Sequence, residues 1–244
     1  MAYRAQQHTS QIVLVLKDPI FVKQMAWVAL LGVVMTVTIL MNVDFLNTKY
    51  PDPVLPQPPD LILDSIPPNY TFITIGEYLS RLEAAFMAFF FLSSTARLRR
   101  LPRLFFMLAI MYILRGFAFT LTPLKQIVSP EEYYSASNFF AQKFYHGMYF
   151  SGHSASALIQ AFFFWDERYR GTRITWFVLP VALAEIVSLL ISHQHYSVDI
   201  FGAVFVAYFA LTFNFMNLVP KPLLQHRWMP WRNENPGASP TPGQ

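Results

Sequence analysis

Residues 174–199 read ITWFVLPVALAEIVSLLISHQHYSVD, an apolar run that closes on two histidines and an aspartate. The run decides the fold because its apolar part has the length of a membrane span, for which about 20 mostly apolar residues are needed. Comparable blocks lie at 25–43, 72–93, 104–122, 151–166 and 197–218. The sequence therefore predicts an all-α fold, a polytopic membrane protein with six transmembrane helices.

Composition supports a membrane protein. Hydrophobic residues make up 54% of the chain and charged residues 13%. The apolar positions fall in blocks and not in amphipathic stripes, as is typical of membrane spans. The chain has no cysteine, which excludes a disulfide framework, a thiolate metal site and a cysteine nucleophile. We expect neither a metal nor another cofactor.

Lysine and arginine positions give the expected orientation. In a six-span topology nearly all of them fall on one side, and only Lys49, Lys125 and Lys143 fall on the other. By the positive-inside rule both termini are cytoplasmic. The basic residues flank the membrane, where they can meet anionic lipid head groups, so the sequence predicts no nucleic-acid partner.

Three regions follow from this topology. Residues 1–24 are expected to be a cytoplasmic segment that can include an interfacial helix, and residues 25–218 the membrane catalytic domain. Residues 219–244 are expected to be a cytoplasmic tail, largely disordered because few of its last residues are apolar. The first block lies far from the N-terminus and lacks a small-x-small cleavage site, so we expect it to be retained.

Two motifs carry the predicted chemistry. The fourth span begins near Ser151-Gly152-His153 and the fifth ends near His193, so both motifs meet at the extracytoplasmic face. His195 and Asp199 are four apart and can share a helix face, where the carboxylate would orient the imidazole. Ser151 and Gly152 at a helix start expose N–H groups that suit phosphate. We therefore predict His153, His195 and Asp199 as catalytic, with the helix start as a phosphate site.

Ionisable residues inside spans are expensive and point to function. Arg115 lies in the third span and Glu77 in the second. For Arg115 the sequence leaves two uses open, phosphate binding and an ion pair with Glu77. Glu77 can also pair locally with Arg81, four residues on. Tyr149 lies near the outer mouth, where its ring could contact a cationic group of a ligand, although interfacial tyrosines are common in membrane proteins.

Several of these strings resemble one family. Phe150-Ser151-Gly152-His153 and the run from His193 to Asp199 resemble the third and fourth signature regions of the sphingomyelin synthase family, a branch related to the phosphatidic acid phosphatase type 2 superfamily. Pro56-Gln57-Pro58-Pro59-Asp60 looks like the proline-rich segment of that family, and Tyr112-Ile113-Leu114-Arg115 fits its pattern in the third span. The resemblance covers about residues 50–210.

The chain also departs from the family pattern. Tyr145-His146-Gly147 stands where the family usually has Cys-Gly-Asp. Lipid phosphatases of the superfamily place an arginine six residues before the second histidine, where this chain has Leu189 after Ser188. The second departure favours the synthase branch.

The resemblance implies transfer of a phosphorylated head group from a phospholipid donor to ceramide or diacylglycerol. His195 would be the nucleophile, His153 the proton donor and acceptor, and Arg115 and the N–H groups around Gly152 the anion site. A lipid phosphate phosphatase is the alternative enzyme, and a lipid transporter or scaffold is the alternative from another class. The head group, self-association into a homo-oligomer, and the choice between a bacterial inner membrane and a Golgi or plasma membrane stay open.

Overall fold

The computed structural model describes residues 11–49, 57–121, 124–125, 127, 146–147, 150–165 and 173–212. Tyr149 and the C-terminal segment from residue 213 lie outside these ranges, so the predictions made for them stay predictions.

Six long helices make up most of the described part, each at one of the six predicted apolar blocks. They are α2 (Pro19–Lys49), α4 (Thr71–Leu92), α6 (Leu101–Leu121), α8 (Gly152–Trp165), α9 (Arg173–Ile191) and α10 (Ser197–Thr212). Two short helices, α3 (Leu61–Ser65) and α5 (Thr95–Leu98), and two paired strands, β1 (Leu124–Lys125) and β2 (His146–Gly147), lie in the connections.

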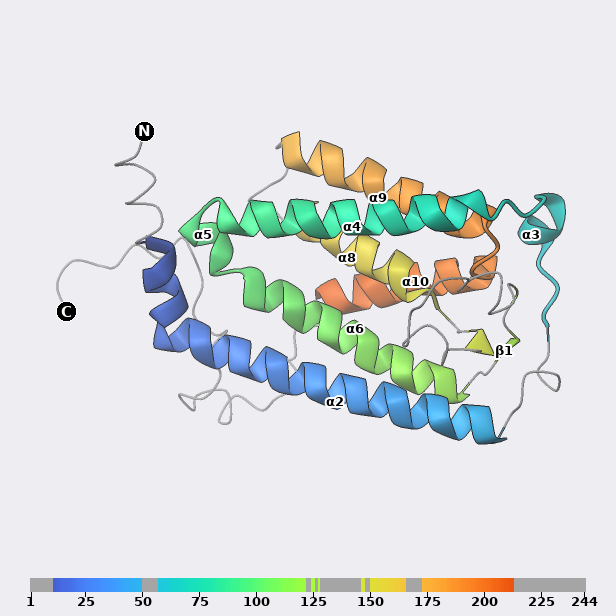
Figure 1. Cartoon of the computed structure of the whole chain (residues 1–244), viewed down its shortest axis with the longest axis horizontal. Helices are drawn as coiled ribbons and strands as arrows, with labels where there is room; N and C mark the ends of the chain where they lie inside the picture. The colour runs from blue at the N-terminus through green and yellow to red at the C-terminus, as the bar shows by residue number, and fades with distance from the viewer. Residues whose placement is uncertain are drawn as a thin grey trace.

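The long helices run alternately up and down in one bundle (Figure 1). As a result α3, β1, the end of α9 and the start of α10 lie at one end of the bundle, and α5 lies at the other. The arginines of the α5 region, which the sequence placed on the cytoplasmic side, are therefore at the opposite end from the His195 motif.

Helix α8 lies at the centre and packs on α9, α10 and α6. Small side chains make this packing close, since Ala155 and Ala157 of α8 and Ala203 and Ala207 of α10 are fully buried. Helices α4 and α9 also approach closely at Gly76, where an added Cβ would lie 2.7 Å from the Ser188 hydroxyl oxygen. Small residues thus set the spacing of the helices that carry the two motifs.

The first long helix starts earlier than the apolar block alone indicates. Asp18 accepts a hydrogen bond from the Ile20 N–H at 3.0 Å, and Pro19 occupies the first helical position. An acidic cap followed by proline is a normal helix start. Asp18 also pairs with Arg99 at 3.2 Å, which ties this end of α2 to the α5 region. Residues 11–17 before it are helical as well.

Within the described ranges, two helical stretches are long and apolar enough to cross a membrane, Pro19–Asn42 and Thr95–Ala118. Trp176–Ile191 and Ser197–Leu211 are apolar but shorter. Helix α4 is long enough but carries Glu77, Arg81 and Glu83, and α8 spans only about 21 Å at 1.5 Å per residue. The protein is thus mostly helical with two candidate membrane-spanning helices, and six spans remain a prediction.

Candidate active site

His195 and Asp199 form the centre of the site. The Nδ1 atom of His195 lies 3.5 Å from Oδ2 of Asp199, and the exposed fractions of the two side chains are 11% and 1%. Asp199 is the third residue of α10, and its Oδ2 also accepts the Tyr196 N–H at 3.1 Å. In a capping box, the side chain of the third helical residue accepts the N–H of the residue before the helix, and Asp199 makes this contact with Tyr196. Since Nδ1 faces the carboxylate, Nε2 is the ring nitrogen left for chemistry.

The other oxygen of Asp199 has a different environment. Oδ1 is buried and has no hydrogen-bond partner among the described residues. Buried polar atoms are nearly always satisfied in folded proteins, so an unsatisfied one calls for a functional or structural reason. At this position a buried, unpaired carboxylate oxygen lies next to the oxygen that contacts His195.

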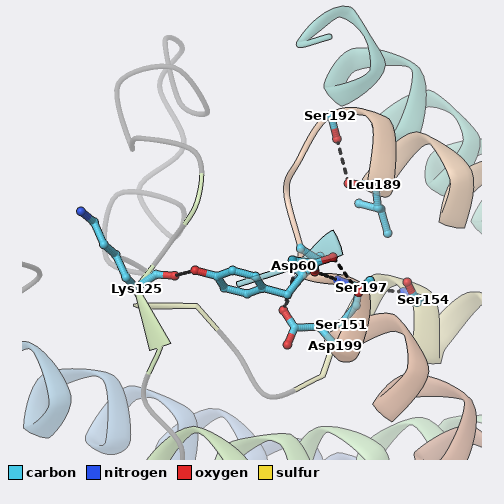
Figure 2. A network of polar contacts seen from close by, with 10 residues as sticks. Asp60, Lys125, Ser151, Ser154, Leu189, Ser192, Ser197 and Asp199 are labelled. Carbon is cyan, nitrogen blue, oxygen red and sulfur yellow. Dashed lines mark hydrogen bonds and ion pairs between the residues drawn. The ribbon is translucent and has the colours of Figure 1, made fainter. Parts of the chain in front are cut away.

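The start of α8 is hydrogen-bonded to the backbone of Asp199. Ser151 caps the helix, because its hydroxyl oxygen accepts the Ser154 N–H at 3.1 Å, as the sequence predicted for this residue. The Ser151 N–H donates to the backbone carbonyl of Asp199 at 3.0 Å. Figure 2 shows Ser151 and Asp199 side by side. The two motifs, some forty residues apart in sequence, are thus linked through the backbone.

His153 and Arg115 complete the cluster. His153, the second residue of α8, is exposed and lies close enough to interact electrostatically with both Arg115 and His195. Arg115 comes from α6, and its guanidinium lies where the side chain of residue 152 would be. A Cβ built on Gly152 would lie 1.9 Å from Nη1 of Arg115 and 2.5 Å from Cζ. The absence of a side chain at Gly152 therefore makes room for the guanidinium.

This arrangement has the properties of an anion site. Gly152 and His153 are the first two residues of α8, so their N–H groups have no carbonyl partner within the helix. The positive end of the helix dipole and a guanidinium fork then meet at one point. An exposed imidazole lies beside them, and the His195–Asp199 pair lies within electrostatic range of it. Donors of these kinds are typical of phosphate-binding sites, so the predicted phosphate site stays a prediction.

Glu77 is placed differently. Its carboxylate pairs with Arg81 at 2.8 Å on the same helix, with 51% of the Glu77 side chain and 69% of the Arg81 side chain exposed. Such an exposed pair contributes little to stability. The structure therefore supports the local pairing that the sequence left open, and a substrate-binding role for Glu77 remains a prediction.

Sequence reasoning assigned no role to Asp60, although its proline-rich segment was part of the family resemblance. Asp60 caps α3 by accepting the N–H groups of Ile62 and Leu63 at 3.1 and 3.2 Å. Its carboxylate also accepts the N–H and the hydroxyl of Ser197, at 2.6 and 2.9 Å. Burial raises the pKa of Asp60, but the hydrogen bonds from Ser197, Leu63 and Ile62 outweigh it and leave the pKa below its ordinary value.

The end of α9 is fixed by His193. The N–H of His193 donates to the Leu190 carbonyl at 3.0 Å and that of Gln194 to the Leu189 carbonyl at 3.1 Å, which is a Schellman motif. His193 takes the left-handed position that glycine usually fills, with φ of 56°. Its Nε2 lies 2.8 Å from the carbonyl oxygen of Ile66. His193 is thus a structural residue and not a freely solvated one.

Tyr196 is buried, and Asp199 accepts its backbone N–H. Its hydroxyl donates to the Lys125 carbonyl at 2.8 Å. Burial, followed by the charges of Asp199 and Asp60, raises the pKa of Tyr196 to about 12. The phenol therefore stays protonated at neutral pH and acts as an anchor for the loop.

Residues 148–216 match the family described as PAP2 superfamily C-terminal. A comparison with curated proteins finds no match. The matched region contains His153, His195 and Asp199, while Asp60 and Arg115 lie upstream of it. The match does not distinguish the synthase branch from the phosphatase branch. Over residues 148–216 the chain is similar to the PAP2 superfamily, which supports a membrane-associated lipid enzyme of the phosphatase or phosphotransferase type acting on lipid phosphates.

Proposed function

We propose that the protein is an integral membrane lipid phosphotransferase. It moves a phosphorylated head group, such as phosphocholine or phosphoethanolamine, from a phospholipid to ceramide or diacylglycerol. One observation carries the proposal, the His195–Asp199 pair at 3.5 Å, tied through the backbone to the α8 start where Arg115 and Gly152 are in contact. A nucleophile oriented by a carboxylate is of no use to a passive lipid-binding scaffold.

The first step is attack on the phospholipid. Nε2 of His195 attacks phosphorus while Nδ1–H is held by Asp199, and a nitrogen–phosphorus bond forms. The phosphorus–oxygen bond to diacylglycerol breaks, and protonated His153 gives its proton to the departing oxygen. Arg115 and the first N–H groups of α8 bind the non-bridging oxygens, where charge accumulates in the transition state.

The second step returns the enzyme to its starting state. Neutral His153 takes the proton from the hydroxyl of the acceptor lipid as that oxygen attacks phosphorus. The nitrogen–phosphorus bond breaks, and His195 is restored. Because His153 gives a proton in one step and takes one in the other, the cycle needs no net proton and no external oxidant or reductant.

Transfer to a lipid, and not to water, is favoured by the residue at position 189. Lipid phosphatases of the superfamily carry an arginine there, whereas Leu189 is apolar and 3% exposed. The site therefore lacks one polar group that could help to hold water beside phosphorus. Exclusion of water decides between transfer and hydrolysis in a chemistry that both branches share.

We place all six long helices across the membrane with both termini cytoplasmic. The large apolar side chains exposed on α2, α9 and α10, such as Val33, Val187 and Phe205, suit contact with lipid tails. The histidine motifs then lie at the extracytoplasmic end, within reach of head groups in that leaflet. Acceptor and donor lipids would enter from the side of the bundle.

Product analysis tests the proposal. The purified protein is incubated in mixed micelles with fluorescent ceramide, fluorescent diacylglycerol and phosphatidylcholine, phosphatidylethanolamine or phosphatidic acid, and the products are separated by chromatography and mass spectrometry. We expect a fluorescent lipid that has gained the donor's head group, and none from His195→Ala. Release of free phosphate or water-soluble head group would indicate the phosphatase. No product of either kind from any donor would contradict both enzymes and favour the scaffold.

A further inference from the structure

The segment from Asp60 to Asn69 is fastened to the loop that carries His195. The His193 ring contacts the Ile66 carbonyl at 2.8 Å, and the Asn69 N–H donates to the Ile191 carbonyl at 3.0 Å. The third contact is the shortest, because the Asp60 carboxylate accepts a hydrogen bond from the Ser197 N–H at 2.6 Å. These three contacts hold the loop that carries His195 against the segment from Asp60 to Asn69.

Asp60 and Asp199 hold two consecutive backbone N–H groups from two directions. Asp199 accepts the N–H of Tyr196, and Asp60 accepts the N–H of the next residue, Ser197, together with its hydroxyl. Figure 2 shows Asp60, Ser197 and Asp199 in this arrangement. His195 directly precedes Tyr196 and Ser197 in the chain. Any shift of the peptide groups of these two residues therefore moves the His195 imidazole.

We infer that Asp60 is a positioning residue, which sets the start of α10 and through it the geometry of the His195–Asp199 pair. The inference rests on the proposed function, because it concerns the rate of the reaction assigned to that pair. Asp60 itself lies in the connection before α4, outside residues 148–216, which match the PAP2 superfamily model.

A role limited to capping α3 does not account for the contacts. Helix α3 has five residues and would be marginal by itself. The two cap bonds to Oδ1 of Asp60 measure 3.1 and 3.2 Å. The bonds from Ser197 are shorter, 2.6 Å from its N–H to Oδ2 and 2.9 Å from its hydroxyl to Oδ1. Asp60 is also 8% exposed, so its charge is compensated mainly by these donors and less by water. The tighter part of the network thus faces α10.

Kinetics of four variants test the inference, with phosphatidylcholine as donor and fluorescent ceramide as acceptor. Asp60→Asn keeps the shape of the side chain and loses the charge, and Asp60→Ala loses both. Ser197→Ala removes the hydroxyl contact. The matched control is Asp64→Asn, which removes a charge from the same short helix at an exposed position.

We expect kcat to fall about tenfold in Asp60→Asn and about a hundredfold in Asp60→Ala, since misplacement of a catalytic group by about 1 Å costs on that order. The KM for phosphatidylcholine should stay within about twofold, because the phosphate-binding Arg115 is untouched. Asp64→Asn should match the wild type. The melting temperature of each variant is measured in the same detergent, and activity is expressed per folded protein.

A second readout does not depend on turnover. Diethyl pyrocarbonate modifies neutral imidazole, and the rate at the peptide that contains His195 is followed by mass spectrometry. We expect Asp60→Asn to raise the rate at His195 several-fold and Asp64→Asn to leave it unchanged. If Asp60→Ala does not fold, Asp60→Asn and Ser197→Ala still decide the matter.

The outcomes separate the two proposals. If the wild type makes no product with any donor and acceptor of the assay above, and the His195 labelling rate in Asp60→Asn is unchanged, both proposals are overturned. If the wild type is inactive with all of them but labelling is faster in Asp60→Asn, the proposed function is overturned and the positioning role is retained. An active wild type with equal kcat and equal labelling in Asp60→Asn and Asp64→Asn would overturn the positioning role alone.

Discussion

The substitution Gly152→Ala perturbs the proposed anion site without replacing a charged residue. The new Cβ would lie 1.9 Å from Nη1 and 2.5 Å from Cζ of Arg115. An ordinary contact between such atoms is about 3.5 Å, so the guanidinium must withdraw by about 1.6 Å. A shift of that size takes the guanidinium out of hydrogen-bond range of a phosphoryl oxygen.

The effect should fall on activity and not on stability. We expect kcat/KM to drop about a hundredfold, which corresponds to about 2.7 kcal/mol of transition-state stabilisation. The clash involves the far end of a flexible side chain, and alanine is favoured over glycine in a helix by up to about 1 kcal/mol. The melting temperature should therefore change by only a few degrees.

Transfer from phosphatidylcholine to fluorescent ceramide and a thermal melt in one detergent measure both quantities. Gly32→Ala is the control, because nothing lies within 4 Å of the added Cβ on α2. Gly152→Ala with at least half of the wild-type kcat/KM would show that the guanidinium does not bind the phosphoryl group. A parallel loss of activity and melting temperature would show that the site had collapsed as a whole.

Asp199→Asn should lower kcat by about 10⁴-fold, as for the orienting carboxylate of a triad. Its melting temperature should stay close to that of the wild type, because the amide oxygen can still accept the Tyr196 N–H. A loss of kcat below about tenfold would make Asp199 a structural residue. Arg115→Lys should fold and lose most of its kcat/KM, since an ammonium cannot make a forked contact, whereas Glu77→Gln should change the melting temperature little, as expected of an exposed pair; full activity of the lysine variant would contradict the phosphate role. The pKa of Asp60 lies below its ordinary value, so its charge stabilises the fold above about pH 4, and that contribution is lost as the pH falls further. The difference in melting temperature between wild type and Asp60→Asn should therefore be larger at pH 7 than at pH 3, and a constant difference would refute the assignment.

Helix positions could be predicted because they depend on local sequence. Each of the six apolar blocks overlaps one long helix. The spacing of His195 and Asp199 predicted that the two side chains meet, which they do, but the expected shared helix face was wrong, because α10 begins at Ser197 and His195 lies in the turn before it. The start of α2 was predicted six residues late, because hydropathy hides the cap formed by Asp18 and Pro19. The number of spans does not follow from helix positions alone, since α4 combines a spanning length with three charged residues.

Contacts between distant segments could not be predicted in the same way. Asp60 and Ser197 are 137 positions apart, and their contact depends on how the segment from Asp60 to Asn69 packs against the start of α10. The contact of Arg115 with Gly152 depends on the distance between α6 and α8, which is set by side chains along both helices. The ion pair of Glu77 with Arg81 is the opposite case, because it joins residues four apart on one helix and the sequence alone already offered it.

The most direct test of the account is the identity of the covalent intermediate. Wild-type protein is mixed with phosphatidylcholine in the absence of an acceptor, stopped with alkali to preserve phosphoramidates, digested and sequenced by tandem mass spectrometry. The account predicts a phosphocholine adduct on His195, absent from His195→Ala, which disappears when ceramide is added before the stop. An adduct on His153 in place of His195, or turnover in His195→Ala, would contradict it.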